Sequence, residues 1–177
     1  MNLNNQMSRT MKEIVIGIDP DVEASGVAEL NTVTRTIKLF NLDFNGICSY
    51  LRRIKQEFGD LAQIHIEDSS NTTHNWHLSS RYGSSARSAR IGYDVGRNHQ
   101  LCFDVYDYAC QLGLDISRQI PFKKCWKGKD GKISHEEICS FVPIQQKKTN
   151  QEQRDAALIA WLCAGFPIYI PPRKKGK

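Results

Sequence analysis

The sequence predicts one α/β domain, built on a mixed five-stranded sheet flanked by helices. Two strand-like segments, 13–18 and 61–67, each end in a carboxylate, Asp19 and Glu67. An apolar stripe at helical spacing runs through residues 86–112. Strands and helices alternate after the third strand, an order typical of sheets in which helices join parallel neighbours. A chain of 177 residues is long enough to bury one such core.

Each element has a local signal in the sequence. The first three strands are separated by short turns, which predicts an antiparallel meander, and the first and fourth strands are expected to be central neighbours. Ile47, Leu51 and Ile54 share one helical face, and Gly59 ends that helix. The expected strands are 13–18, 26–30, 33–42, 61–67 and 114–120. The expected helices are 45–58, 86–112 and 150–164, with a short helix after the S-x-x-E capping box of Ser134 and Glu137.

Glycines stand on the expected inward stripe of the long helix. Glycine inside a helix costs about 1 kcal/mol relative to alanine, so Gly92 and Gly96 indicate a close approach to the sheet or to a partner helix. The expected inward residues are Gly92, Val95, Gly96, His99, Cys102, Phe103, Tyr106, Ala109 and Cys110.

Composition narrows the class of protein. No apolar run approaches the roughly 20 residues that a membrane-spanning helix needs, so no membrane partner is expected. The leader 1–12 is polar and is predicted to be disordered, and the chain is predicted to be cytoplasmic. The six cysteines have no zinc-like spacing and are expected to be reduced. Three of them, Cys48, Cys110 and Cys163, are expected to be buried.

Positive charge gathers in a few segments of this chain, whose net charge is +5. Such clusters favour a polyanion such as DNA, and the alternative is a solvated basic loop with a solubilising tail at 167–177. Trp76 either stacks on an unpaired base or packs its own loop against the core. The candidate DNA-binding residues are Lys123, Lys124, Lys127, Lys129, Lys132, Arg81 and Trp76.

Four acids from three distant segments are candidates for a catalytic site. If the first and fourth strands are parallel neighbours, Asp19 and Glu67 meet at one edge of the sheet. Glu152 and Asp155 are three residues apart at the start of the last helix and share one of its faces. Divalent ions such as Mg²⁺ or Mn²⁺ relieve the repulsion of clustered carboxylates, and two such ions clamp the oxygens of a phosphoryl displacement. Singly, each acid also fits a turn, a strand end or a helix N-terminus.

Three segments of the chain, in order, resemble the acidic motifs of RuvC-type Holliday junction resolvases in the RNase H-like superfamily. These segments are IGIDPDVEASGVAEL, IHIEDS and EQRDAALIAWL, and VGRNHQ resembles the long-helix signature of the phage-like branch. The family usually has glycine where this chain has Asp21, and aspartate where it has Glu152.

The resemblance implies an RNase H-like nuclease domain at 13–166. It further implies a homodimeric crossover junction endodeoxyribonuclease that cuts four-way or branched DNA with two Mg²⁺ ions per active site, or with Mn²⁺. Matched residue by residue, the catalytic and metal-binding acids are Asp19, Glu67, Glu152 and Asp155. The five lysines correspond to the basic segment of the family.

Other functions remain open from the sequence. An RNase H-like nuclease with another substrate, such as an RNA–DNA hybrid, has the same acids, and a catalytically silent nucleic-acid-binding module has the same fold. Actin-like kinases also begin with a strand of the GIDxG type, but they need two such domains, for which 177 residues are too few.

Overall fold

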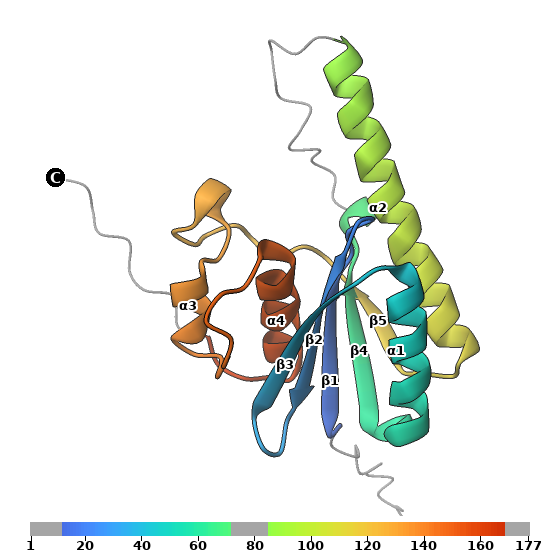
Figure 1. Cartoon of the computed structure of the whole chain (residues 1–177), viewed down its shortest axis with the longest axis vertical. Helices are drawn as coiled ribbons and strands as arrows, with labels where there is room; N and C mark the ends of the chain where they lie inside the picture. The colour runs from blue at the N-terminus through green and yellow to red at the C-terminus, as the bar shows by residue number, and fades with distance from the viewer. Residues whose placement is uncertain (1–11, 72–84, 169–177) are drawn as a thin grey trace, which may run out of the picture.

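A mixed five-stranded sheet lies at the centre of the molecule in the computed structural model, which describes residues 12–71 and 85–168 (Figure 1). The strand order is β3-β2-β1-β4-β5. β1 is antiparallel to β2 and parallel to β4, β3 is antiparallel to β2, and β5 is parallel to β4. The strands are β1 (Ile14–Asp19), β2 (Ser25–Asn31), β3 (Thr36–Leu42), β4 (Ala62–Glu67) and β5 (Ile116–Gln119). The predicted fold class, a mixed sheet of five strands flanked by helices, is therefore confirmed.

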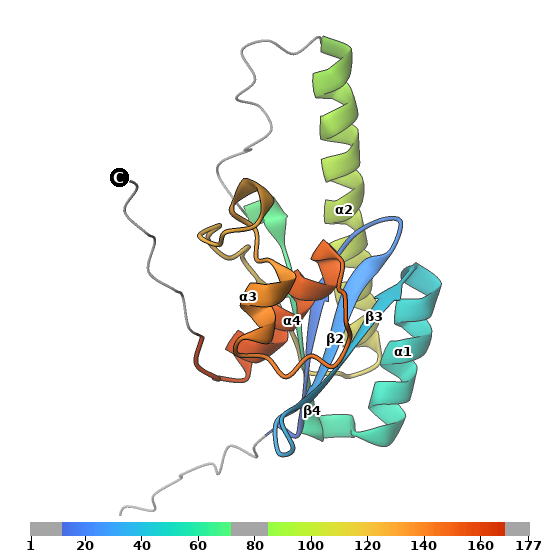
Figure 2. The ribbon, with the colours of Figure 1, turned by 60° about the vertical axis from the view of Figure 1, so that its left-hand side comes forward.

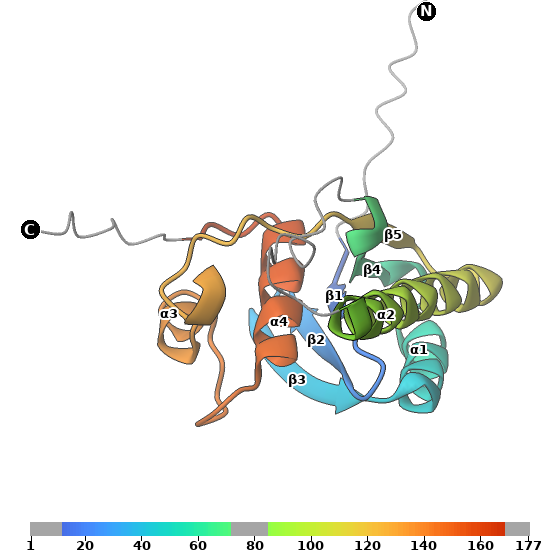
Figure 3. The ribbon, with the colours of Figure 1, turned by 90° about the horizontal axis from the view of Figure 1, so that it is seen from above.

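Helices cover both faces of the sheet (Figures 2 and 3). One face is covered by α1 (Phe44–Glu57) and by α2 (Ser85–Gln111). The other face is covered by α4 (Gln151–Cys163), and the short α3 (His135–Cys139) packs beyond it. None of the helices in these described ranges is long and apolar enough to cross a membrane.

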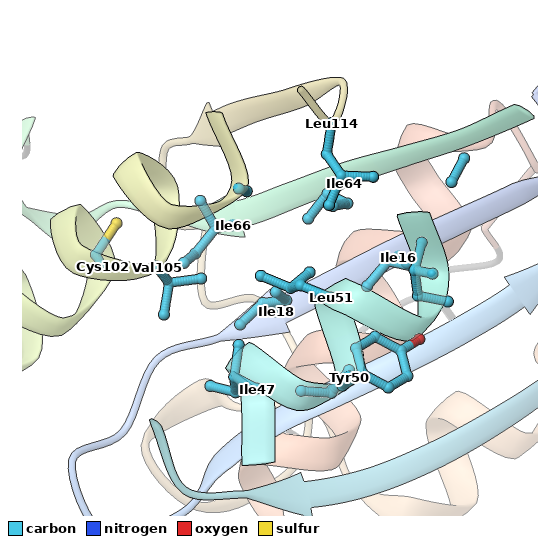
Figure 4. Packing of buried hydrophobic residues seen from close by; sticks show 14 of the residues in the cluster. Ile16, Ile18, Ile47, Tyr50, Leu51, Ile64, Ile66, Cys102, Val105 and Leu114 are labelled. Carbon is cyan, nitrogen blue, oxygen red and sulfur yellow. The ribbon is translucent and has the colours of Figure 1, made fainter. Parts of the chain in front are cut away.

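Alternation along the strands divides the buried side chains between two cores. Isoleucines of β1 and β4 point toward α1 and α2, where they meet Leu51 and Val105 (Figure 4). Ala28 and Leu30 of β2 point the other way and join a second core with α3 and α4. Residues of β1 and β4 between those isoleucines therefore face α4.

Two glycines let α4 lie against the sheet with its backbone. A Cβ atom added to Gly17 in β1 would stand 2.1 Å from the carbonyl oxygen of Ala156. A Cβ atom on Gly26 in β2 would stand 2.0 Å from the carbonyl oxygen of Glu152. Because real Cβ contacts are never this short, any side chain at these positions forces the helix away.

Several boundaries and exposures differ from the sequence predictions. β3 begins at Thr36 and not at residue 33, because Arg35 has a φ of 55° in the preceding turn and Val33 is exposed. β5 is limited to Ile116–Gln119. Gly113 forms a turn with a φ of 65°, and the side chain of Leu114 packs into the core.

The expected inward stripe of α2 is correct only for its second half. Cys102 and Ala109 are buried, whereas Gly92, Gly96 and Cys110 are exposed. The first half of α2 extends beyond the sheet (Figure 1), and among the residues that the structure describes no other segment lies within 4 Å of the Cβ positions of Gly92 and Gly96. All six cysteines are free, and of the three that were expected to be buried only Cys48 is, Cys163 being half-buried.

The helix starts agree closely with the capping signals. Ser134 and Glu137 form the predicted capping box at α3, and Asn150 with Gln153 forms a second one at α4. Lys12, placed in the expected leader, is held by Asp115 at 2.9 Å. The rest of that leader and nearly all of the predicted basic tail lie outside the described residues, so the domain limits stay predictions.

We predict that Gly26→Ala destabilises the fold, because its methyl group displaces the first turn of α4. Overpacking of this kind costs about 1–3 kcal/mol in the free energy of unfolding. The matched control is Gly92→Ala, since no atom of another described segment lies within 4 Å of the Cβ position there. That change should leave the monomer as stable or stabilise it by up to about 1 kcal/mol. Urea denaturation at low protein concentration gives both values, and equal midpoints for the two variants would contradict the packing described.

Candidate active site

The ends of β1 and β4 bring two carboxylates to one edge of the sheet. The two strands are parallel, and Ile18 pairs with Ile66. The next residue in each strand is an acid, Asp19 in β1 and Glu67 in β4, so the two acids are neighbours at the strand ends. Both acids follow isoleucines that point toward α1 and α2, and they therefore face α4. The predicted juxtaposition of these two acids is observed.

The close approach of α4 adds a third carboxylate. Asp19 pairs with Gly26 across β1 and β2, and Gly26 lies directly against the backbone of Glu152. Asp155, one turn further along α4, therefore stands over the end of β1. Asp19, Glu67 and Asp155 line one pocket of about 150 Å³.

The fourth predicted acid has a different place. Glu152 does not line the pocket, although its charge raises the pKa values of both Asp19 and Asp155. Its carbonyl group is the part of the residue that contacts the sheet. Three of the four predicted acids thus meet in the pocket, with Glu152 at its margin.

Burial and mutual repulsion raise the pKa values of the acids at the strand ends. Burial is the largest cause for Asp19, whose pKa lies well above its ordinary value, and the charges of Glu67 and Asp155 add to it. Burial, followed by the charge of Asp155, raises the pKa of Glu67 to about 7, although Lys132 and Lys124 oppose the rise. These carboxylates therefore lie close enough together to disfavour full ionisation.

A short polar network holds Asp155. Burial raises its pKa, and a hydrogen bond from Gln151 opposes that rise, with the Gln151 Nε2 atom 2.9 Å from Oδ1 of Asp155. Arg154 donates in turn to Oε1 of Gln151 at 2.7 Å. Sequence reasoning missed both supporting residues, although the four-residue spacing of Gln151 and Asp155 was a usable signal.

Lysines face the carboxylates across the pocket. Nζ of Lys132 lies 4.0 Å from Oδ2 of Asp155, and Lys123 and Lys124 also line the pocket. Lys127 and Lys129 are exposed and do not line it. The floor is apolar, and the residues that form it are Pro121, Phe122, Trp126, Ile133 and Leu158.

Other acids near the strand ends have structural partners. Asp21 accepts hydrogen bonds from the backbone N–H groups of Glu23 and Ala24, at 2.9 and 3.4 Å, so its side chain shapes the turn after β1. Asp68 is buried, and one of its oxygens lies 3.4 Å from Arg118. The remaining predicted DNA-binding residues, Arg81 and Trp76, lie outside the described residues.

The donor atoms of the pocket fit a hard divalent cation. The acids offer only carboxylate oxygens, which Mg²⁺ and Mn²⁺ prefer. Within 12–71 and 85–168, no three His, Cys, Asp or Glu side chains form a set ready to hold an ion. Mg²⁺, however, keeps several waters and binds through one or two carboxylates together with substrate phosphates. The arrangement therefore fits an ion that is shared with a phosphate substrate.

No family model matches the chain, and no curated protein matches it in sequence. The chain is similar to a solved structure of Thermus thermophilus RuvC in complex with a Holliday junction substrate, at 13% identity and a TM-score of 0.49, covering 83% of this chain and 89% of that one. A second Thermus thermophilus RuvC structure has 16% identity, a TM-score of 0.46 and coverages of 86% and 96%.

The Fowlpox virus resolvase in complex with Holliday junction DNA is also similar, at 13% identity and a TM-score of 0.41, covering 85% of this chain and 98% of that one. At such identities and TM-scores the likeness bears on the general course of the chain and not on its activity.

We predict that Glu67→Gln stabilises the metal-free protein at alkaline pH. Between an ordinary value of 4.5 and its folded pKa of about 7, Glu67 keeps a proton that the unfolded chain releases. The stability of the wild type therefore falls as the pH rises through this window and stays low above it. The variant should be more stable at pH 8, by on the order of 2 kcal/mol after allowance for solvent screening.

The measurement is urea denaturation in the presence of a chelator at pH 4 and pH 8. The advantage of Glu67→Gln should vanish at pH 4, where both states of the wild type hold the proton. Glu23→Gln, which removes an exposed carboxylate, is the matched control. An advantage of the same size at both pH values would show that ionisation of Glu67 is not its cause.

Proposed function

We propose that the chain is a metal-dependent, structure-selective DNA endonuclease that resolves four-way junctions by paired phosphodiester hydrolysis. The observation that carries this proposal is the convergence of Asp19, Glu67 and Asp155, from three distant segments, on one pocket rimmed by lysines. Half-buried acids with raised pKa values opposite basic side chains suit an anionic substrate that is bound together with cations.

The pocket residues divide the work between ion binding and substrate binding. Asp19, Glu67 and Asp155 would hold Mg²⁺ or Mn²⁺, and Glu152 adds negative charge at the margin. Two such ions, when bound, would stabilise the attacking and leaving oxygens of an in-line displacement at phosphorus. Lys124 and Lys132 face the same space and would contact the phosphate, while Gln151 orients the carboxylate of Asp155.

The choice of substrate rests on the sequence motifs. The three acidic segments resemble RuvC-type resolvases, and VGRNHQ resembles the long-helix signature of their phage-like branch. The three acidic segments supply, in order, the pocket acids Asp19, Glu67 and Asp155. Exposed lysines beside the pocket suit the sugar-phosphate backbone, which positions a duplex without reading its sequence.

The long helix supports a two-subunit enzyme. The sheet, which lies wholly within the described residues, has no atom within 4 Å of the Cβ positions of Gly92 and Gly96, so the alternative that they pack against the chain's own sheet does not hold. Tyr93 is 64% exposed on the same helix, and Arg97 lies over its ring. A C2 dimer presents one active site to each of two opposing strands, as paired incision of a junction requires.

We predict that Asp19→Asn lowers cleavage of a labelled four-way junction by at least about 100-fold, because it removes a charged ligand and no core packing. Junction binding should persist. Asp21→Asn is the matched control two residues away, since asparagine keeps the side-chain oxygen that accepts the turn hydrogen bonds. Gel assays with Mg²⁺ measure both activities.

The wild-type substrate panel in the same assay includes duplex DNA and an RNA–DNA hybrid. Preferred cleavage of the hybrid would show that an RNA–DNA hybrid, and not a four-way junction, is the substrate. Binding of DNA without any cleavage would identify a silent binding module. Full activity of Asp19→Asn would remove that residue from the site.

We predict that the protein is a homodimer through the first half of α2. Gly92→Leu combined with Gly96→Leu should give a monomer, because the bulky side chains block the close approach of a partner helix. Ser49→Leu, on the exposed face of α1, is the matched control and should leave the dimer intact. Light scattering at micromolar concentration measures the mass, and cleavage of a cruciform plasmid measures pairing of the cuts. A wild-type monomer that leaves nicked circles as its lasting product would contradict the dimer.

A further inference from the structure

A single buried carboxylate organises the segment that carries the pocket lysines. This segment, residues 121–134, is called the basic loop here. Glu137, which is 9% exposed at the start of α3, accepts the backbone N–H of Lys127 with both carboxylate oxygens, at 3.0 and 3.1 Å. It also accepts the N–H of Ser134 at 3.0 Å. The carboxylate therefore ties the middle of the basic loop to its end.

Helix capping alone does not account for these contacts. A capping box uses the glutamate only for the N–H of the N-cap residue, which is Ser134 here. Lys127 lies outside that motif, and its two hydrogen bonds to Glu137 are additional. Hydrogen bonds to an ionised acceptor are about twice as strong as neutral ones, so they suit a loop that has to keep one shape.

The basic loop is also bonded to the helix that carries Asp155. Nε of Arg154 donates to the carbonyl oxygen of Ile133 at 2.9 Å, and the same guanidinium donates to Gln151 at 2.7 Å. Gln151 in turn donates to Asp155. One end of the loop and one acid of the pocket are therefore held by the same side chain.

The shape of the loop brings two lysines together. The N–H of Trp126 donates to the carbonyl oxygen of Gly131 at 3.0 Å, and Gly131 has a φ of 75° that favours glycine. The Cβ position of Gly131 lies 3.2 Å from Cβ of Lys124, which places Lys124 beside the backbone that precedes Lys132. Both lysines line the pocket, and both lower the pKa of Glu67.

We propose that Glu137 is a positioning residue, which holds the basic loop so that Lys124 and Lys132 face the scissile phosphate. This inference rests on the proposed function. Glu137 itself is buried behind the loop and does not line the pocket, so it acts only through the lysines. Because these hydrogen bonds hold the loop backbone in one shape, less of the loop has to be ordered when DNA binds.

The test replaces Glu137 with an isosteric amide. In Glu137→Gln, one oxygen becomes an NH₂ group, which cannot accept, so at most two of the three hydrogen bonds from the N–H groups of Lys127 and Ser134 persist, and the remaining oxygen is neutral and a weaker acceptor. Hydrogen exchange of these two amides should accelerate at least about tenfold, a readout that needs no DNA. Ser134→Ala is the control, because it removes the capping hydroxyl and keeps the carboxylate. Glu137→Asp is a second variant, which keeps the charge on a shorter arm and should have a smaller effect.

DNA binding provides the functional readout. Each lost phosphate contact should flatten the slope of log K against log salt by about 0.9, so Glu137→Gln should flatten it by about 1 to 2. In a background with both Lys124→Ala and Lys132→Ala, the same change should have no further effect on the slope, whereas damage to the fold would add to it.

The outcomes separate the inference from the proposed function. Faster exchange with an unchanged salt slope would overturn the inference and leave Glu137 as a cap. Equal effects of Glu137→Gln on the salt slope in the wild type and in the variant with both Lys124→Ala and Lys132→Ala would also overturn it. If the wild type binds DNA with the expected salt slope but cleaves none, the proposed nuclease activity is contradicted. The role of Glu137 in positioning the lysines can still be tested by the slope of Glu137→Gln.

Discussion

The contact of α4 with two glycines of the sheet is the constraint on which the rest of the molecule depends. At Gly17 and Gly26 the helix backbone lies against the strand backbone, with no room for a side chain. This approach places Asp155 above the end of β1, where Asp19 stands. Since an α-helix packed through larger side chains stands further from a sheet, the glycines determine whether the acids meet at all. The same contact buries the alanines of α4 in the second core.

The candidate site is electrostatically unfavourable in the absence of cations. Burial and neighbouring charges raise the pKa values of Asp19, Glu67 and Asp155, and the lysines compensate only in part. Replacing these acids would stabilise the metal-free fold, and this cost is consistent with the catalytic role that we propose for them. The apolar surroundings that raise the pKa values also strengthen the interaction of the acids with a bound cation.

Much of the fold could be predicted from alternation and helical spacing. The acid at the end of each strand, Asp19 or Glu67, is a local property of the sequence, and their meeting followed from the order of elements that predicts parallel pairing of the two strands. The capping box at Ser134 was equally local. The outward face of Gly92 and Gly96 was not predictable, because helical periodicity shows which residues share a face but not how far the sheet extends beneath it. The margin position of Glu152 likewise depends on how α4 docks.

The sequence by itself determined the order of the strands and helices, the acids at their ends and the basic character of residues 121–134. These features depend on interactions between residues close together in the chain. Only the tertiary structure decided which lysines face the acids and which remain in solvent. That choice depends on backbone dihedrals at Asp130 and Gly131, and on the hydrogen bonds from the N–H of Lys127 to the buried carboxylate of Glu137. Such contacts form after the chain has folded back on itself, and no spacing pattern encodes them.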